Sequence, residues 1–481
     1  MEIDLRGANH LQFIGTATSH FQAEPLPVDL ATVPVLDWES EVLKSVRGKS
    51  AHIHYRQYLQ DLPHLLEKPE QYTKRSNELG MNMFRFSLEA GRLSPKIGEF
   101  NEKLMARYVG FMALLKSQGQ EPMITLQHYT MPLSYCRIVS GDMETGAWED
   151  PDIVSYFQYV TKKIVGFLCD QDKVRAAIRD AGIPEGYAEA MLVKGLVSWF
   201  ITLNEPIMTP LQGYLSGLYP PYKKSKLGLA KKVLGKMVEV HDVMYSLLKD
   251  TRSSSCAIHD QKVGIAYNWS YLDGALGFIS HKLMNEWLYA DRFERDGSHS
   301  DFLGVQYYFR ETPPFFGKKW RGRVYSEHPG FGDICPAGIL EVLKRMHRAY
   351  PKKDVFITEF GFPDTSDQRR PYWIMQTFLR VLEAIRIGIP VRGILHWSLV
   401  DNFEWDWGTD QRFGLLTEAQ TERPLARDED DSQRIHSWEA WKACATRARM
   451  PSKRSELMFD RAYELAKVQY DGFRYCEHCA K

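Results

Sequence analysis

The sequence of 481 residues predicts an α/β protein, a single-domain (β/α)8 TIM barrel with loop insertions. Two observations favour this fold. Eight short apolar segments rich in β-branched and aromatic residues recur along the chain, and most are separated by long segments with apolar residues at helical spacing. An open doubly wound sheet is the rival, but no glycine-rich phosphate loop follows the first predicted strand. We therefore expect a closed barrel spanning residues 1–481.

The eight predicted strands are largely apolar on both faces, as strands buried in a parallel sheet should be. They are Phe13–Ser19, Met83–Leu88, Pro122–His128, Trp199–Asn204, Lys262–Asn268, Asp301–Tyr308, Val355–Glu359 and Gly393–Val400. Helical spacing of apolar residues predicts helices at Glu102–Gly119, Asp152–Cys169, Leu229–Leu248 and Tyr372–Gly388.

Three stretches do not fit a minimal barrel. Long insertions are expected at about 24–49, after the first strand, and at about 170–195, where a charged helical hairpin precedes the fourth strand. The chain beyond Thr417 is charged, and a helical tail is expected from about residue 437.

Composition excludes some classes of function. Lys+Arg and Asp+Glu both number 61, so the formal net charge is zero, which argues against a nucleic-acid binder. No segment has the roughly 18 uninterrupted apolar residues of a membrane span, and the first residues lack the apolar core of a signal peptide. The seven cysteines are odd in number and mostly scattered, which is typical of a reducing compartment. We expect a cytoplasmic protein with no membrane span.

The ends of the predicted strands carry the residues that could do chemistry. In a parallel barrel the active site forms at the carboxyl ends of the strands. Those ends supply His20, Gln22, Arg85, His128, Asn204, Glu205, Tyr308, Glu359 and Trp397, with Glu404 and Trp405 shortly after the last strand. Glu205 and Glu359 follow strands four and seven, across the barrel from each other, with no cluster of metal ligands beside them. Two carboxylates ringed by Trp, Tyr, His, Asn and Gln indicate cleavage of a glycosidic bond.

Several of these strand ends resemble signatures of glycoside hydrolase family 1, the β-glucosidase and β-galactosidase family. Thr202-Leu203-Asn204-Glu205-Pro206 is similar to its acid/base signature, and Ile357-Thr358-Glu359-Phe360-Gly361 is similar to its nucleophile signature. The run from Trp397 to Trp405 matches its sugar-binding loop. Four further landmarks occur in the family's order: Gly15–Ser19 with Gln22, Arg85–Ser87, His128 and Gly304–Tyr308. The resemblance covers about residues 11–415.

The resemblance implies a role for each matching residue. Glu205 would be the general acid/base and Glu359 the nucleophile, with Arg85 and Tyr308 orienting that nucleophile. The sugar would be bound by Gln22, His128, Asn204, Tyr308, Trp397, Glu404 and Trp405. No cofactor and no metal is implied. The expected reaction is hydrolysis of a β-glucoside or related neutral β-glycoside, small or oligosaccharide, by double displacement. In retaining enzymes the two carboxyls lie roughly 5–5.5 Å apart.

Some positions depart from the family. Gln306 stands where Asn is usual, Ala90 replaces a usual Trp and Pro25 a usual Gly. These changes bear on the aglycone side and on part of the sugar pocket. The loop Asp406–Asp410 lacks the Ser, Lys and Tyr that phosphosugar-specific members use, which favours a neutral sugar.

Two alternatives to a hydrolase remain open. One is a transglycosidase of the same family, in which an alcohol or lipid hydroxyl replaces water. The other is a catalytically silent relative that binds glycans, although silent relatives commonly lose one of the two carboxylates. The pair Cys476 and Cys479 near the end of the chain has too few neighbouring ligands for zinc, so no metal site is expected there. Oligomeric state is not predicted.

Overall fold

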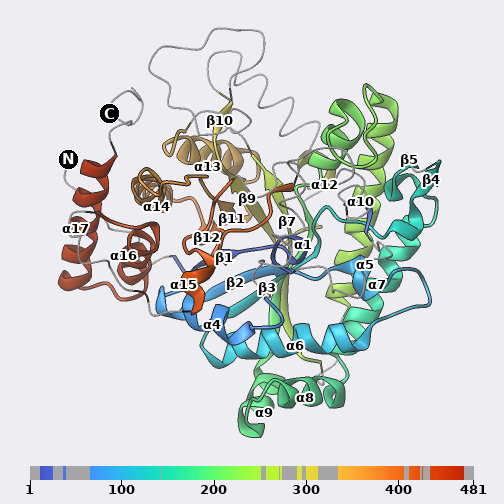
Figure 1. Cartoon of the computed structure of the whole chain (residues 1–481), viewed down its shortest axis with the longest axis horizontal. Helices are drawn as coiled ribbons and strands as arrows, with labels where there is room; N and C mark the ends of the chain where they lie inside the picture. Colours follow the sequence, from blue (N-terminus) through green and yellow to red (C-terminus); the bar gives the residue numbers. More distant parts are fainter. Residues whose placement is uncertain are drawn as a thin grey trace.

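The computed structural model describes residues 11–24, 36–38, 65–140, 142–250, 256–269, 271–272, 290–294, 299–311, 334–405, 411–422, 425 and 434–470. Eight parallel strands close into a barrel at the centre of the molecule (Figure 1). They are β1 (Phe13–Ala17), β2 (Met83–Ser87), β3 (Glu121–Gln127), β6 (Val197–Asn204), β7 (Ile258–Asn268), β9 (Phe302–Tyr307), β11 (Asp354–Phe360) and β12 (Val391–Trp397). The barrel closes because β1 pairs with β12 on one side and with β2 on the other.

The predicted barrel is therefore confirmed, and each predicted strand corresponds to one of these eight. The differences lie at the ends. The last strand begins at Val391 rather than Gly393 and stops at Trp397. Its register is fixed by pairing with β1, where Phe13 lies beside Gly393 and Ala17 beside Trp397.

Helices surround the barrel and cover its outer face (Figure 1). The long ones between strands are α4 (Pro69–Glu78), α6 (Glu102–Ser117), α7 (Ile153–Leu168), α10 (Leu227–Lys249), α13 (Gly338–Ala349) and α14 (Arg370–Arg386). Helix α6 begins where the Asn101 side chain accepts a hydrogen bond from the Leu104 amide at 3.0 Å, as a helix N-cap does. Short helical turns lie at α1 (His20–Ala23), α5 (Ala90–Leu93), α12 (Asp291–Phe293) and α15 (Glu418–Glu422), with a π-helical segment at Thr209–Ser216.

The inside of the barrel is apolar at its amino-terminal end. Rings of Phe13, Trp199, Phe302 and Phe356 meet there, with centroids 4.8 Å apart for Trp199 and Phe356 and 5.5 Å apart for Trp199 and Phe302. These four rings fill the amino-terminal end of the barrel. The polar side chains therefore lie at the carboxyl ends of the strands.

Two of the expected additions to the barrel are helical. The expected hairpin at 170–195 forms α8 (Gln171–Asp180) and α9 (Glu185–Lys194), and the tail forms α16 (Ser437–Arg449) and α17 (Lys453–Gln469). The insertion at 24–49 lies mostly outside the described residues. Two small sheets pair β4 (Arg137–Val139) with β5 (Asp142–Thr145) and β8 (Tyr271–Leu272) with β10 (Arg310–Glu311). That the whole chain is one domain stays a prediction.

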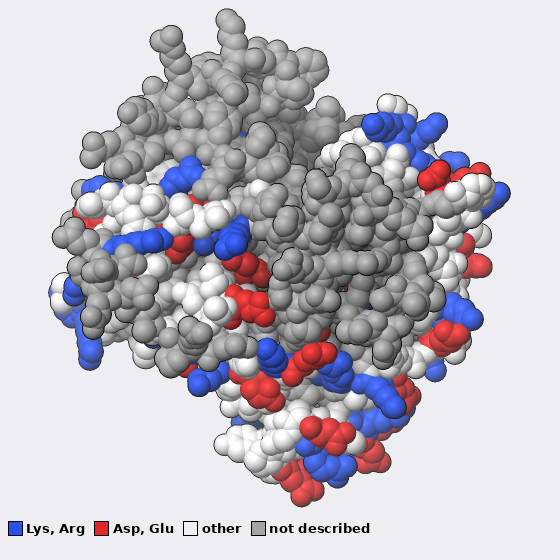
Figure 2. All heavy atoms as spheres, viewed as in Figure 1, with Lys and Arg blue, Asp and Glu red and all other residues white. Residues whose placement is uncertain are grey.

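Charges of both signs are interspersed on the described surface. Figure 2 shows blue and red side by side at the bottom of the molecule, where Figure 1 places α8 and α9. Arg175 there pairs with both Asp172 and Glu189, and Lys173 reaches Glu102 on α6. Among the described helices, none combines the length and apolar character needed to cross a membrane.

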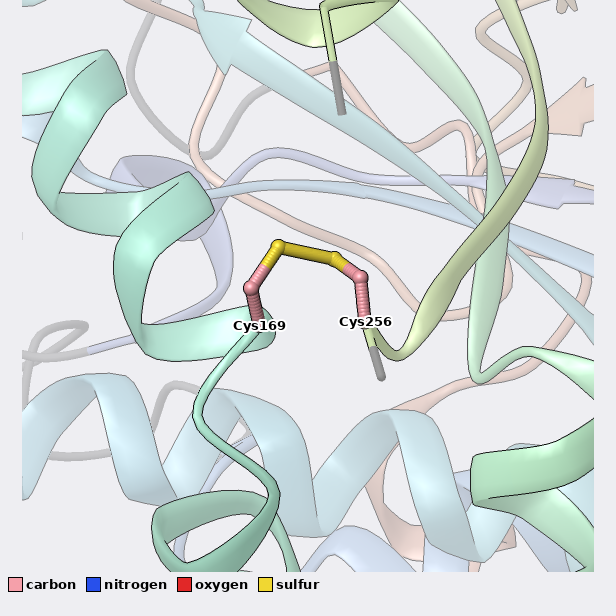
Figure 3. The surroundings of a disulfide bond; sticks show 2 residues. All are labelled: Cys169 and Cys256. Carbon is pink, nitrogen blue, oxygen red and sulfur yellow. A yellow bond between two sulfur atoms is a disulfide. The ribbon is translucent and has the colours of Figure 1, made fainter. Parts of the chain in front are cut away.

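One disulfide joins Cys169, at the end of α7, to Cys256, just before β7 (Figure 3). Cys136 and Cys444 carry free thiols. The scattered spacing of the cysteines did not indicate this pair, because its two members are 87 positions apart. The structure therefore pairs two of the cysteines whose scattered spacing is more typical of a reducing compartment than of a disulfide framework. The cytoplasmic location stays a prediction.

Candidate active site

The two carboxylates of the predicted site lie at irregularities in the barrel. In β6 the pairing with β7 shifts register between Ile201 and Asn204, immediately before Glu205. In β11 the pairing with β9 shifts between Ile357 and Glu359. Such bulges redirect a side chain at the end of a strand. They occur where the chain turns Glu205 and Glu359 into the mouth of the barrel.

Glu359 is held by three donors. Arg85 on β2 donates to Oε1 at 2.5 Å, and its side chain is fully buried. Gln306 on β9 donates to the same oxygen at 2.5 Å, and the Tyr308 hydroxyl donates to Oε2 at 2.5 Å. The expected contacts of Arg85 and Tyr308 with Glu359 are present, whereas the contact from Gln306 was not expected.

Asn204 shares two of these donors. Its Oδ1 accepts from Arg85 at 2.6 Å and from Gln306 at 2.8 Å. Arg85 and Gln306 therefore bridge the end of β6 and the end of β11. Because Oδ1 is occupied, the Asn204 amide group Nδ2 is the part left to meet a ligand.

Glu205 has different surroundings. It is 6% exposed, and its Oε2 accepts from the Tyr129 hydroxyl. Asn268 at the end of β7 provides a second side-chain hydrogen bond. Burial and the nearby charge of Glu359 raise the pKa of Glu205 to about 8. Sequence reasoning missed Tyr129 and Asn268, although Tyr129 directly follows the predicted site residue His128.

Burial acts on both carboxyls but is opposed more strongly at Glu359. Burial raises the pKa of Glu359 as well, while the charge of Arg85 and the hydrogen bonds from Tyr308 and Arg85 lower it. With an ion pair to Arg85 and two further donors, Glu359 is the member of the pair that holds the negative charge. Glu205 is the member that keeps a proton at neutral pH.

An aromatic group stands beside the carboxylates. The Trp397 ring nitrogen donates to Glu404 Oε1 at 2.7 Å, which fixes two of the predicted sugar-binding residues against each other. The His128 ring lies nearly parallel to two indoles, with centroid distances of 5.8 Å to Trp397 and 6.1 Å to Trp405. His128 Nδ1 is buried and has no hydrogen-bond partner within the described residues, and burial lowers the pKa of this imidazole. The imidazole is therefore neutral at neutral pH.

Gln22 lies against the same group but is already hydrogen-bonded. Its Nε2 donates to the Phe403 carbonyl at 2.6 Å, and its Oε1 accepts from Ser19 at 2.7 Å. Next to Phe403, the Asn402 amide is 3% exposed, and neither of its polar atoms finds a partner in the described part of the chain. Asn402 is a further polar group at this site that sequence reasoning did not single out.

Tyr129 also lines a small cavity. Its lining is aromatic and proline-rich: Asp37, Trp38, Tyr129, Gly146, Ala147, Trp148, Thr209, Tyr214, Tyr219, Pro220 and Pro221.

Of the departures from the family, Ala90 is buried at the start of α5, while Pro25 and the loop 406–410 lie outside the described residues. Within the described chain no group of three or more His, Cys, Asp or Glu side chains is arranged to hold a metal ion. The Cys476 and Cys479 pair falls beyond that part.

Comparison with known proteins agrees with this geometry. Residues 39–181 and 325–438, together more than half of the chain, match the family described as glycosyl hydrolase family 1. The chain belongs to glycosyl hydrolase family 1. It is a glycoside hydrolase, and its barrel is the fold of its structural neighbours.

Its relatives are distant but match over most of their length. The family 1 chain is 24% identical to the 1,4-beta-D-glucan glucohydrolase of Thermotoga neapolitana over 86% of its own length and 94% of that protein. Identity is also 24% to beta-glucosidase A of Thermotoga maritima, with the same coverage. The galactolipid galactosyltransferase of Arabidopsis thaliana is 24% identical over 80% of this chain and 59% of that protein.

Solved structures share the fold. The β-glycosidase of Thermosphaera aggregans superposes with a TM-score of 0.71 at 21% identity, covering 93% of this family 1 chain and 98% of that one. The β-glucosidase of Thermotoga maritima in complex with glucoimidazole gives a TM-score of 0.67 at 20% identity, covering 91% and 98%.

Proposed function

We propose that this family 1 enzyme is a retaining β-glycosidase that hydrolyses β-glucosides or related neutral β-glycosides, with Glu359 as nucleophile and Glu205 as general acid/base. The unequal surroundings of the two carboxyls carry this proposal. Glu359 has an ion pair and further donors that favour its charged form, whereas burial and a neighbouring charge keep Glu205 protonated near neutral pH. A double displacement needs one carboxyl of each kind.

In the first step Glu359 attacks the anomeric carbon, and the bond from that carbon to the leaving oxygen breaks. Glu205 gives its proton to that oxygen, so the aglycone departs as a neutral alcohol. The glycosyl ester on Glu359 has no charge. Arg85 and Tyr308 hold the attacking carboxylate in place and were paired with it before the step, so little reorganisation is needed.

In the second step the roles reverse. With the negative charge on Glu359 gone, one of the two causes that raise the pKa of Glu205 disappears. Glu205, now ionised, takes a proton from water as that water attacks the anomeric carbon. The ester bond breaks, Glu359 regains its charge, and Glu205 is again protonated. Two displacements return the original β configuration.

The expected sugar contacts come from polar and aromatic side chains near the two carboxylates. Asn204 offers its Nδ2, which suits the sugar 2-hydroxyl next to the reacting carbon. His128 and Glu404 both lie against Trp397, and the Glu404 carboxylate would accept hydrogen bonds from sugar hydroxyls. Trp397 and Trp405 present flat apolar faces to the C–H face of a sugar. Gln22, already tied to the Phe403 carbonyl, would bind through its remaining N–H and lone pair.

A neutral sugar is supported by the absence of Ser, Lys and Tyr in the loop Asp406–Asp410. It is also supported by the relatives, which include a beta-glucosidase and a beta-galactosidase. Transglycosylation is the second candidate. It is favoured by the similarity to a galactolipid galactosyltransferase.

A panel of nitrophenyl glycosides tests the substrate. It includes the β-glucoside, β-galactoside, β-fucoside, β-mannoside and 6-phospho-β-glucoside, each with and without added alcohol. We expect turnover of the β-glucoside and of the galactoside or fucoside. A preference of two orders of magnitude for the phosphorylated sugar would contradict the neutral-sugar assignment. If more alkyl glycoside than free sugar formed in dilute alcohol, the enzyme would be a transglycosidase.

Azide rescue tests the two roles. Glu359→Ala should abolish hydrolysis, and azide should restore turnover with an inverted α-azide product, because only one displacement occurs. Glu205→Ala should slow substrates with poor leaving groups by about 10²–10⁴-fold. With an activated aryl glycoside it should give a β-azide after two displacements. If both variants gave the same azide anomer, the assignment of Glu359 as nucleophile and Glu205 as acid/base would be wrong.

A further inference from the structure

Tyr129 makes a contact with the acid/base that the proposed roles do not yet use. It follows β3 and His128, its side chain is 7% exposed, and its hydroxyl donates to Glu205 Oε2. The two residues are 76 positions apart in the chain. The contact joins the end of β3 to the end of β6.

The ring of Tyr129 is fixed from three sides. It meets the Trp405 ring edge-on at 4.9 Å, the Tyr219 ring at 5.9 Å and the His128 ring at 5.3 Å. Its backbone has φ 66°, in the left-handed region that a bulky residue rarely adopts, and Glu205 itself has φ 41°. Unusual backbone angles of this kind persist where the surrounding packing enforces them, and they cluster at functional sites. The direction of the hydroxyl is therefore set by packing.

Few other groups compete for Glu205. The charged and polar groups that face it are Glu359 from β11, Arg85 from β2, Asn268 from β7 and Tyr129. Arg85 is committed to Glu359 and Asn204. Tyr129 and Asn268 are thus the hydrogen-bond donors to this carboxyl within the described residues.

We propose that Tyr129 is a positioning residue that anchors Glu205 through Oε2 and stabilises its ionised form, so that it tunes the acid/base for the second step of the reaction. The inference rests on the proposed function of Glu205. In the first step Tyr129 donates to a neutral acid; in the second it donates to a carboxylate, and hydrogen bonds to charged groups are the stronger kind. Burial raises the pKa of Tyr129, so its hydroxyl stays a donor throughout.

Tyr129→Phe removes only the hydroxyl and keeps the ring contacts. The ionised form of Glu205 then loses a donor, so the pKa of Glu205 rises. The alkaline limb of kcat/KM, which needs protonated Glu205, should move upward by about one pH unit. For an activated aryl glycoside whose second step limits kcat, the acid limb of kcat should move upward too, because that step needs ionised Glu205. The plateau of kcat should fall about tenfold, the size expected for losing one hydrogen bond to a charged group.

Tyr156→Phe is the matched control. Tyr156 is a buried tyrosine on α7 whose hydroxyl donates to the Ser94 carbonyl at 2.9 Å, away from the site. This variant should lose stability without moving either limb. If Tyr129→Phe left both limbs where they are in the wild type, or lowered kcat and kcat/KM equally at all pH values, Tyr129 would have only a packing role.

A titration without turnover separates this inference from the proposed function. In the Glu359→Gln background, the ¹³C resonance of the Glu205 carboxyl reports its pKa directly. Adding Tyr129→Phe should raise that pKa whether or not any glycoside tested is a substrate. An unchanged titration would overturn the inference, whereas a wild-type enzyme inactive on every glycoside would overturn the proposed function.

Discussion

Arg85 organises the catalytic residues from a fully buried position. One guanidinium nitrogen donates to Glu359, a second donates to Asn204, and Nε donates to Thr125 at 2.9 Å. A planar guanidinium with donors in fixed directions suits this arrangement, which a lysine ammonium could not reproduce. The contacts of this one residue therefore favour the negative charge on Glu359 rather than on Glu205.

The pH profile should show that division of charge. The first step needs protonated Glu205 and ionised Glu359. Because the pKa of Glu205 is raised to about 8, activity should fall as pH rises through about 8, and it should fall at acid pH as Glu359 becomes protonated. We expect a bell-shaped curve of kcat/KM against pH with its alkaline limb near pH 8. A limb near pH 4–5 with no loss up to pH 10 would contradict the assignment of Glu205 as the acid.

Gln306 gives a second prediction at this scale. Gln306→Asn shortens the side chain by one methylene and withdraws the amide from Glu359 Oε1, which loses a donor favouring its charge. The acid limb of kcat/KM should move upward, and kcat/KM should fall about tenfold. Gln376→Asn on α14 is the control, because Gln376 donates to Tyr372 outside the site. Should Gln306→Asn behave like that control, the extra hydrogen bond has no role in tuning the nucleophile.

At the scale of the elements, close packing of parallel strands brings the site residues to one rim. Gly15 on β1 shows how little space separates neighbouring strands, since a Cβ there would lie 1.9 Å from the Met83 carbonyl oxygen of β2. The strands that carry Arg85 and Trp397 flank β1 directly. A disturbance at Gly15 would therefore reach the active site.

A pair of glycine variants tests this packing. Gly15→Ala should lower the free energy of unfolding by about 1–3 kcal/mol, because the added methyl forces the strands apart. Gly166 lies at an exposed position of helix α7, where a Cβ would meet nothing within 4 Å, so Gly166→Ala should raise stability by about 0.5–1 kcal/mol. Urea denaturation of the two variants against the wild type measures both effects, and equal stabilities would contradict the close approach of β1 and β2.

At the scale of the whole molecule, the Cys169–Cys256 disulfide links the end of α7 to the start of β7 across 87 positions of chain (Figure 3). The linked segment contains α8, α9, β6 and α10 and includes Glu205. Closing so long a loop restricts the unfolded chain.

Reduction should therefore destabilise the protein without changing the site. We expect the free energy of unfolding to fall by about 2–4 kcal/mol in dithiothreitol or in the double variant Cys169→Ser with Cys256→Ser. Cys444→Ser, which removes a free buried thiol, should not abolish the effect of dithiothreitol. If the wild type gave the same urea midpoint with and without reductant, the disulfide would be absent in solution or without effect on stability.

The alternation of apolar strands and helical segments was sufficient to predict the barrel, and the polar residues at its strand ends were sufficient to name Glu205, Glu359, Arg85 and Tyr308. Both inferences depend on local properties: the period of apolar residues, and the rule that parallel strands end at one rim. Both inferences can therefore be made from residue type and from position along a strand.

Only the tertiary structure decided the contacts between distant positions. Three such contacts join residues more than 50 positions apart. They are the hydrogen bond from Tyr129 to Glu205, the hydrogen bond from Gln306 to Glu359 and the disulfide between Cys169 and Cys256. Such contacts depend on side-chain length, on strand register and bulges, and on backbone angles such as the positive φ of Tyr129. The sequence determined which residue types reach the rim of the barrel; packing determined which of their atoms meet, because a hydrogen bond forms only within a few tenths of an ångström of its ideal distance.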